Sequence, residues 1–277
     1  MEPYWKVIEQ IVKESDLVLE ILDARMIESS RNEELEKMIK KIKRPVIVVI
    51  NKSDLVSSKE LDMGMDKLRK EGVKDALYIS CRKKSSIRNL MIKIRKVFNM
   101  FGKREKIEDS KKSGVHREAE GKIVVGVVGY PNVGKSSIIN ALSFKKKAKV
   151  TVRAGTTHGA HWIASSGNIK FIDTPGVIPM KYMDKTKLDL IGAREVGKIK
   201  DKEIIAAKII NLFLDKNKEI LEKKYGIKIK KGDDAYEIIE DLGRVKKHLK
   251  KKGVVDEQRT STLIIRDWQQ GKLKMGG

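Results

Sequence analysis

Short runs of aliphatic and β-branched residues alternate with longer amphipathic stretches through the first part of the chain. Between the runs, apolar residues recur at helical spacing, as at Leu35, Met38 and Ile42. Nearly continuous apolar runs separated by such helices predict an α/β fold, with a mostly parallel six-stranded sheet covered by helices on both faces. The predicted strands lie at 17–22, 45–50, 76–79, 123–128, 161–164 and 169–172.

Past about residue 184 the strand pattern stops, and three amphipathic helices are predicted. Aspartates provide an N-cap for each, at Asp201, at the Asp-Asp pair 233–234 and at Asp256. The second helix is predicted to continue through Leu249, because apolar residues hold the helical spacing that far. Its polar side carries four lysines: Lys246, Lys247, Lys250 and Lys251.

These patterns divide the chain into two predicted domains. Residues 1–183 form the α/β domain, and residues 184–277 form a small all-α domain. The stretch 102–121 consists mainly of Lys, Glu, Ser and Asp, which predicts a flexible linker or exposed loop inside the first domain.

Composition narrows the class of protein. A chain of 277 residues with 40% hydrophobic residues can bury a sizeable core. The single cysteine, Cys81, excludes an internal disulfide and fits a reducing compartment. No apolar run approaches the roughly 18 residues of a membrane span, and acidic residues interrupt any signal-peptide core near the N-terminus. We therefore expect a cytoplasmic protein, and nothing in the sequence demands more than a monomer.

The charge balance points to a polyanionic partner. Sixty-one Lys and Arg residues against 38 Asp and Glu give a formal net charge of +23. Nucleic acid is the commonest large polyanion that such a field attracts. The alternative is a solvated, lysine-rich surface with no such partner. A membrane is not indicated, because no amphipathic anchor or lipidation motif is evident.

The strand at 123–128 leads into a phosphate-binding loop. Gly129-x4-Gly134-Lys135-Ser136 has the Walker A pattern, in the strand–loop–helix context that this motif requires. Lys135 would place a positive charge on the β- and γ-phosphates, and the Ser136 hydroxyl would bind Mg²⁺. Backbone N–H groups at the start of the helix would surround the phosphates. They come from Asn132, Val133, Gly134, Lys135, Ser136 and Ser137.

Further groups for the metal and the γ-phosphate follow downstream. Asp173 ends the last predicted strand and would hold Mg²⁺ through water, and Gly176 allows its N–H to approach the γ-phosphate. Thr157, with Thr156 as the alternate, lies where a threonine ligand to Mg²⁺ is expected. Lys135 and Gly176 are therefore the candidate catalytic residues, and the group that activates water is left open.

The tetrapeptide Asn-Lys-Ser-Asp at 51–54 indicates guanine as the base. The Asp54 carboxylate can accept both N1–H and the 2-amino group of guanine, a donor pair that adenine lacks. Lys52 would pack its stem along the base, and Asn51 would connect this segment to the phosphate loop. Ser80 and Cys81 follow the next strand, where a second base-contacting loop is expected.

The tetrapeptide precedes the phosphate loop, the reverse of the usual order. The chain resembles the circularly permuted GTPases of the YlqF/RbgA (YawG) family over almost its whole length. The resemblance rests on the motifs above, on Asp23-Ala24-Arg25 with Arg31-Asn32, and on the tail sequence 266–273. It implies a permuted Ras-like domain, followed by a helical domain that contacts ribosomal RNA.

The resemblance also implies a function: GTP hydrolysis in assembly of the large ribosomal subunit, with GTP, GDP, the subunit and its rRNA as partners. Lys246, Lys247, Lys250 and Lys251 become candidate RNA contacts. Val177 stands where many GTPases keep a water-orienting glutamine, so intrinsic hydrolysis should be slow. Asn132 can bind K⁺ beside the phosphates, as in similar loops; the alternative is a purely structural asparagine.

The reversed order suggests how nucleotide state is transmitted, because the chain passes from Asp173 and Gly176 directly into the helical tail. RNA affinity should then differ between the GTP and GDP states. Two other classes stay open. One is a signalling or trafficking switch without an RNA partner, and the other is an RNA-binding module that holds GTP with negligible turnover.

Overall fold

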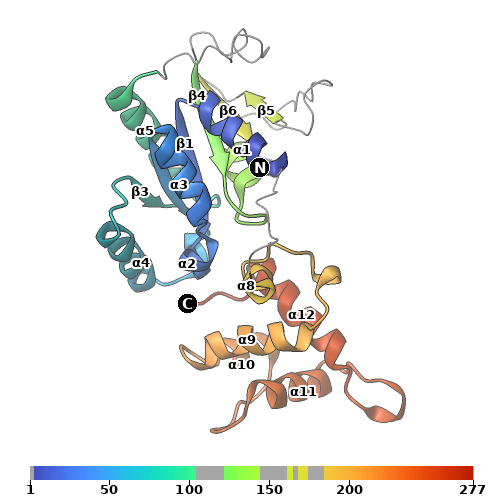
Figure 1. The fold of residues 1–277 in the computed structure, drawn as a ribbon. Helices are drawn as coiled ribbons and strands as arrows, with labels where there is room; N and C mark the ends of the chain where they lie inside the picture. Colours follow the sequence, from blue (N-terminus) through green and yellow to red (C-terminus); the bar gives the residue numbers. More distant parts are fainter. Residues whose placement is uncertain (1–2, 104–121, 144–160, 165–167, 174–183, 277) are drawn as a thin grey trace. The chain divides into compact units, whose positions relative to one another are not determined.

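A computed structural model describes residues 3–103, 122–143, 161–164, 168–173 and 184–276 (Figure 1). Contacts within the chain divide it into two compact units. The sheet unit comprises Met1–Ser53 and Lys59–Tyr182, and the helical unit comprises Asp54–Ser58 and Met183–Gly277. Nothing in the sequence pattern indicated that Asp54–Ser58 would belong to the helical unit.

The sheet unit contains a sheet in the strand order β3-β2-β1-β4-β6-β5. Every pairing is parallel except that of β5 with β6, so the predicted mostly parallel α/β fold is confirmed. All seven residues of β1 are buried, as expected where helices cover both faces of a sheet. The strands are β1 (Leu17–Asp23), β2 (Val46–Asn51), β3 (Ala76–Tyr78), β4 (Ile123–Val128), β5 (His161–Ala164) and β6 (Ile169–Asp173).

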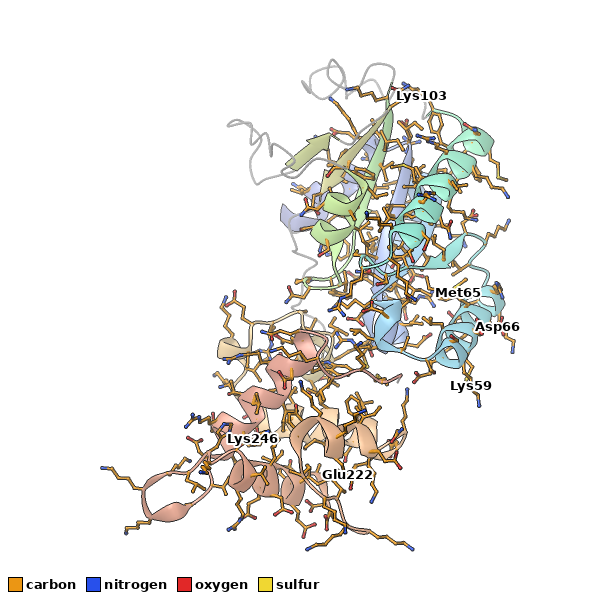
Figure 2. All side chains as sticks on the ribbon, turned by 180° about the vertical axis from the view of Figure 1, so that it is seen from behind. Lys59, Met65, Asp66, Lys103, Glu222 and Lys246 are labelled. Atoms are coloured by element: carbon orange, nitrogen blue, oxygen red, sulfur yellow. The ribbon has the colours of Figure 1, made fainter. Side chains whose placement is uncertain are left out.

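Helices lie on the two faces of this sheet. Helices α1 (Pro3–Glu14) and α3 (Glu33–Ile42) pack against each other, and α5 (Lys84–Phe101) packs against α7 (Lys135–Leu142). Figure 1 shows the first pair in front of the sheet, and the view from behind in Figure 2 shows the second pair in front. The remaining elements are α2 (Ile27–Ser30), α4 (Ser58–Lys70) and the 3₁₀ turns η1 (Ala24–Met26) and η2 (Ser53–Leu55).

The helical unit is built around α9 (Lys202–Leu214), against which α11 (Ala235–Val245) and α12 (Glu257–Gln269) pack. Trp268 is fully buried there, with its ring edge-to-face against Phe213 at a centroid distance of 6.1 Å. Its indole N–H donates to the carbonyl of Leu190 at 2.7 Å. Shorter elements are α8 (Lys185–Leu190), α10 (Glu219–Tyr225), η4 (Val196–Lys198) and η5 (Lys251–Gly253).

The predicted helix starts of this unit are confirmed at the residue level. Asp234 makes a capping box with Glu237 at the start of α11. Asp256 accepts the backbone N–H of Arg259 at 3.0 Å at the start of α12. Asp201 occupies the N-cap position of α9, although its side chain makes no cap hydrogen bond.

The prediction that the second helix continues through Leu249 is wrong. Helix α11 ends at Val245, and Lys247 has a left-handed backbone with φ +54°. The chain then turns back, so that Leu249 forms an antiparallel bridge with Val255. Val255 packs closely on Gly243, and the chain reverses direction to make this contact, which ends the helix.

The four candidate RNA-binding lysines therefore lie on a loop and not on a helix face. We call residues 246–254 the basic loop. Figure 2 labels Lys246 where α11 passes into this loop. All four lysines are exposed: Lys246, Lys247, Lys250 and Lys251.

In the part of the chain that the structure describes, each helix is too short or too polar to cross a lipid bilayer.

Candidate functional site

The predicted chemical motifs of the sheet unit follow the carboxyl ends of parallel strands. Asp23 ends β1 and Asn51 ends β2, and the two are register partners. The phosphate loop follows β4, and Asp173 ends the neighbouring strand β6. Parallel strands bring their carboxyl ends to one edge of a sheet, which is where ligands bind in such folds.

The phosphate loop has the backbone shape that the motif requires. Gly129, Asn132 and Gly134 have φ of 145°, 62° and 104°, so the chain curls tightly before α7 begins at Lys135. A side chain at Gly129 would lie 2.6 Å from the carbonyl oxygen of Ile21. The loop therefore presents backbone N–H groups at a helix N-terminus, the usual cradle for phosphate.

The side chain of Lys135 is held inside this loop by backbone carbonyls of the loop. Its ammonium donates to the carbonyls of Gly129 and Tyr130, each at 2.9 Å. Burial lowers the pKa of Lys135 to about 8, while the nearby Asp173 carboxylate acts in the opposite direction. Anionic phosphates would stabilise the ammonium, so binding should raise this pKa again.

Ser136 and Asp173 supply the predicted metal donors. The Ser136 hydroxyl lies 3.5 Å from Oδ2 of Asp173, although the two come from α7 and β6. Hydroxyl and carboxylate oxygens are hard donors, and Mg²⁺ bound to a nucleotide takes few protein ligands, so the pair fits this ion. Thr156, Thr157, Gly176 and Val177 lie outside the described residues.

Asn51 connects the tetrapeptide to the phosphate loop, as predicted. Its side-chain Nδ2 donates to the carbonyl of Val133 at 2.8 Å, across 82 residues of sequence. Gly134 makes this approach possible, because a Cβ there would lie 2.1 Å from the same nitrogen. The two motifs are thus one structural assembly despite their reversed order.

The second predicted base loop lies beside the first. The backbone N–H of Ser53 donates to Ile79 at 3.0 Å, and Cys81 Sγ lies 3.6 Å from Oδ1 of Asn51. The Ser80 hydroxyl accepts the N–H of Arg82 at 3.2 Å, which closes the turn after β3. Asp54, the predicted guanine acceptor, follows directly and is grouped by its contacts with the helical unit.

A buried ion cluster around Asp23 supports the tetrapeptide. The Asp23 carboxylate accepts from Arg25 at 2.8 and 3.0 Å and from Lys52 Nζ at 2.7 Å. Burial alone would raise the pKa of Asp23, but the two cations outweigh it and lower the pKa to about 2. Lys52, expected to lie along the base, is anchored at its ammonium end by this carboxylate.

Asn32 supports the phosphate loop through Tyr130. Its Nδ2 donates to the hydroxyl of Tyr130 at 2.7 Å, while its Oδ1 caps α3 through the N–H of Leu35. Tyr130 is fully buried, and its carbonyl is one of the two that hold Lys135. The sequence singles out Asp23, Arg25, Arg31 and Asn32 without assigning them chemistry, and a structural role is expected. Asp23, Arg25 and Asn32 make the supporting contacts described above, and Arg31 pairs with Glu36 and Glu71.

Comparisons with known proteins agree with this geometry. Residues 124–251 match the family described as 50S ribosome-binding GTPase, and residues 1–96 match the family described as ethanolamine utilisation - propanediol utilisation. A GTP-binding protein of Methanocaldococcus jannaschii is 35% identical over 271 residues, which are 98% of this chain and 66% of that protein.

Two further relatives also align over almost all of this chain. Ribosome biogenesis GTPase A of Priestia megaterium is 28% identical, over 96% of this chain and 89% of that protein. Nucleolar GTP-binding protein 2 of Pneumocystis carinii is 29% identical, over 97% of this chain and 52% of that protein. The chain thus spans between about half and nine tenths of the length of these relatives.

Solved structures share the fold. GNP-bound YlqF from T. maritima superposes with a TM-score of 0.62 at 23% identity, over 99% of this chain and 96% of that one. Its GDP-bound form gives a TM-score of 0.63 at 22% identity. With a tetrapeptide that precedes the phosphate loop and yet is hydrogen-bonded to it, the chain belongs to the YlqF/RbgA family of circularly permuted GTPases.

Proposed function

We propose that this protein hydrolyses GTP to GDP and phosphate and acts as an assembly factor for the large ribosomal subunit. The observation that carries the nucleotide part is the bond from Asn51 to Val133, since it joins a guanine-reading segment to a phosphate-binding one. The names of the relatives support the ribosomal part. A ribosomal partner also supports the proposed location in the cytoplasm, and the protein is proposed to act as a monomer.

The residue roles follow the two motifs. Ser136, Asp173 and Thr157 hold Mg²⁺, which neutralises charge on the β- and γ-phosphates when it is bound. Lys135 and Gly176 act on the γ-phosphate. The nucleotide contacts come from Asn51, Lys52, Asp54, Ser80, Cys81, Asn132, Val133, Gly134, Lys135, Ser136, Ser137, Thr157 and Gly176.

The decisive test of base choice is calorimetry with GDP and ADP, in which GDP alone should bind tightly. Asp54→Asn should then exchange guanine for xanthine, because an amide presents an N–H to the 2-keto group and still accepts N1–H. Equal binding of GDP and ADP by the unaltered protein would refute guanine recognition.

Asn132 is proposed to hold K⁺ beside the phosphates. Its left-handed backbone, φ 62°, places it at the curl of the loop. Single-turnover hydrolysis should be faster in K⁺ than in Na⁺ buffer, and Asn132→Ala should remove the difference. Equal rates in the two salts would leave Asn132 with a structural role only.

The basic loop is proposed to bind rRNA through Lys246, Lys247, Lys250 and Lys251. The side chains of these lysines are exposed, so their ammonium groups can contact RNA phosphates at the protein surface. Binding should therefore fall with salt and show little sequence preference by itself. We further propose that RNA affinity differs between the GTP and GDP states, because the chain runs from Asp173 through Gly176 into the helical unit.

Two experiments separate this function from its alternatives. Co-sedimentation with large ribosomal subunits distinguishes an assembly factor from a signalling switch without an RNA partner. Single-turnover hydrolysis with and without subunits distinguishes it from an RNA-binding module that scarcely turns GTP over. Slow intrinsic hydrolysis that subunits accelerate is the expected result.

A further inference from the structure

The sheet unit contains a cavity of about 430 Å³ that is separate from the nucleotide motifs. Its walls come from β1, α3, the start of β2, the segment 71–75 between α4 and β3, and the end of α5. It lies beside the amino ends of β2 and β3, whereas the nucleotide motifs follow the carboxyl ends of the strands. Sites for small organic ligands start at roughly 300 Å³, so the cavity is large enough for one.

Apolar side chains form one part of the lining. Ile39 and Val48 are buried at its inner side, and the Phe101 side chain is 60% exposed. Pro45, Val46 and Val73 complete this apolar part. The hydrocarbon part of a ligand could therefore be enclosed here without needing a polar partner.

Glu20 gives the cavity a buried polar group. It lies in the middle of β1, lines the cavity and is only 2% exposed. Its Oε1 is buried and, among the residues that the structure describes, accepts no hydrogen bond. A buried acceptor without a donor is unfavourable, and such an atom needs an explanation in a folded protein. A ligand that carries a donor would provide one.

The charges around Glu20 indicate which kind of donor fits. The Arg31 guanidinium already donates to both carboxylate oxygens of Glu36, at 2.7 and 2.8 Å, and pairs with Glu71 as well. When Glu20 is ionised, three carboxylates therefore share one guanidinium. Burial first, and then Glu36, raise the pKa of Glu20 to about 8, against the opposing effects of Arg31 and the N–H of Asn32. A cation beside Glu20 would favour its ionised form.

The other charged groups of the lining are exposed or have partners elsewhere. Lys40 and Lys74 are exposed, Arg44 donates to a backbone carbonyl at 3.1 Å, and Asp75 pairs with a lysine of α5 at 2.6 Å. The Tyr130 phenol also lies near Glu20, and burial raises its pKa, so it stays neutral around pH 7. Glu20 is therefore the acid whose protonation a ligand in this cavity should change.

We propose that this cavity binds a small organic amine, with its ammonium group beside the Glu20 carboxylate and its hydrocarbon part against Ile39 and Val48. A primary ammonium supplies both N–H donors and a counter-charge, whereas an alcohol or water supplies only a donor. An anion would meet the carboxylates of Glu36 and Glu71. Binding ionises Glu20, and the proton from its carboxyl group passes to the solvent.

The test compares hexylamine, 1-hexanol and hexanoate, which share a hydrocarbon chain and differ in charge. Calorimetry on the whole chain at pH 7 should show hexylamine binding at least about tenfold more tightly than 1-hexanol, and hexanoate more weakly still. In two buffers of different ionisation enthalpy, hexylamine should release close to one proton. Its affinity should rise about tenfold from pH 6 to 7, because the ionised fraction of Glu20 rises by that factor.

Glu20→Gln keeps the side-chain volume and removes the charge. It should weaken hexylamine binding by about tenfold or more, abolish the proton release and leave 1-hexanol unaffected. Glu33→Gln is the matched control, because Glu33 is exposed on α3 and does not line the cavity. Thermal unfolding shows whether each variant is folded, and the proton release of the unaltered chain needs no variant at all.

N-acetyl-lysine methylamide distinguishes a free amine from the lysine side chain of another protein. Hexylamine binding without binding of this derivative supports the proposal. The proposal is overturned if the derivative binds and hexylamine does not, or if the three hexyl ligands bind equally. It is also overturned if Glu20→Gln binds hexylamine unchanged, or if hexylamine does not bind at all, which would leave the cavity to water.

Discussion

The Asp23 cluster of the sheet unit and the basic loop of the helical unit both depend on charge, but they use it in opposite ways. Around Asp23 the charges are buried and paired, with the Arg25 side chain only 1% exposed. Along residues 246–254 the lysines are exposed to solvent. The first arrangement fixes the geometry of a nucleotide loop, and the second offers a field to a large anion.

This difference predicts how each region responds to substitution. When one partner of a buried ion pair is removed, the other charge stays buried without its counter-charge. A single substitution there should therefore lower the free energy of unfolding substantially. Exposed charges are screened by solvent and salt, and one can stand in for another. Each substitution there should therefore have a small effect on stability or binding, and the effects of several should add.

The largest effect is expected at Asp23. Asp23→Ala leaves the buried Arg25 guanidinium without its carboxylate and releases Lys52, which should lower the free energy of unfolding by about 3–5 kcal/mol. Urea denaturation measures this loss. The control is Asp66→Ala, which breaks an exposed pair with Arg69 and should cost at most about 1 kcal/mol. Similar losses in both variants would contradict the contrast between buried and exposed charge.

Lys135 tests whether another buried cation serves chemistry. Lys135→Ala should slow single-turnover GTP hydrolysis by about 10²–10³-fold, as expected when a preorganised charge on the reacting phosphate is lost. Lys59→Ala removes an exposed lysine of the same unit and should leave the rate unchanged. A rate that survives in Lys135→Ala would exclude the proposed catalytic role.

Glu20 sharpens the comparison, because it is a buried acid with incomplete pairing. Its Oε1 is buried and, among the described residues, accepts no hydrogen bond. Burial first, and then the nearby Glu36, raise its pKa to about 8, against the opposing effects of Arg31 and the N–H of Asn32. The folded state therefore binds this proton more tightly than the unfolded state does.

The sign of the pH dependence follows from that shift. Protonated Glu20 stabilises the fold fully below about pH 4.5, and this contribution is lost as the pH rises towards 8. Glu20→Gln should remove that slope and raise the free energy of unfolding at pH 7.5 by on the order of 2 kcal/mol. Glu33→Gln, at an exposed site, should leave the slope unchanged. An unaltered pH profile in Glu20→Gln would argue against a neutral buried acid.

The smallest effects per residue are expected in the basic loop. Each lysine replaced should weaken RNA binding uniformly across sequences and reduce the slope of log affinity against log salt by about 0.7–0.9. Alanine suits Lys246, Lys250 and Lys251, whereas Asn suits the left-handed position of Lys247. Filter binding at several salt concentrations measures the slope.

The control for the loop replaces four exposed lysines of the sheet unit, Lys59, Lys70, Lys83 and Lys84. If both sets change the slope equally, the net charge of the protein would explain RNA binding and the loop would have no special role.

Many structural features of this protein depend on residues that are close together in the sequence. The strands of the sheet, the phosphate loop with its left-handed residues and the caps at Asp234 and Asp256 depend on neighbouring residues, so pattern and spacing predicted them. Even the bond between Asn51 and the phosphate loop could be expected, because parallel strands bring their ends to one edge.

The tertiary structure alone decided the features that depend on distant partners. The helical periodicity ran on through Leu249, but Val255 packing on Gly243 ended α11 early and placed the lysines on a loop. Similarly, no local signal predicts that the N–H of Met275 donates to the carbonyl of Leu55, more than 200 residues away. Local preference amounts to a few tenths of a kcal/mol per residue, so burial of a single side chain or backbone contact can override it.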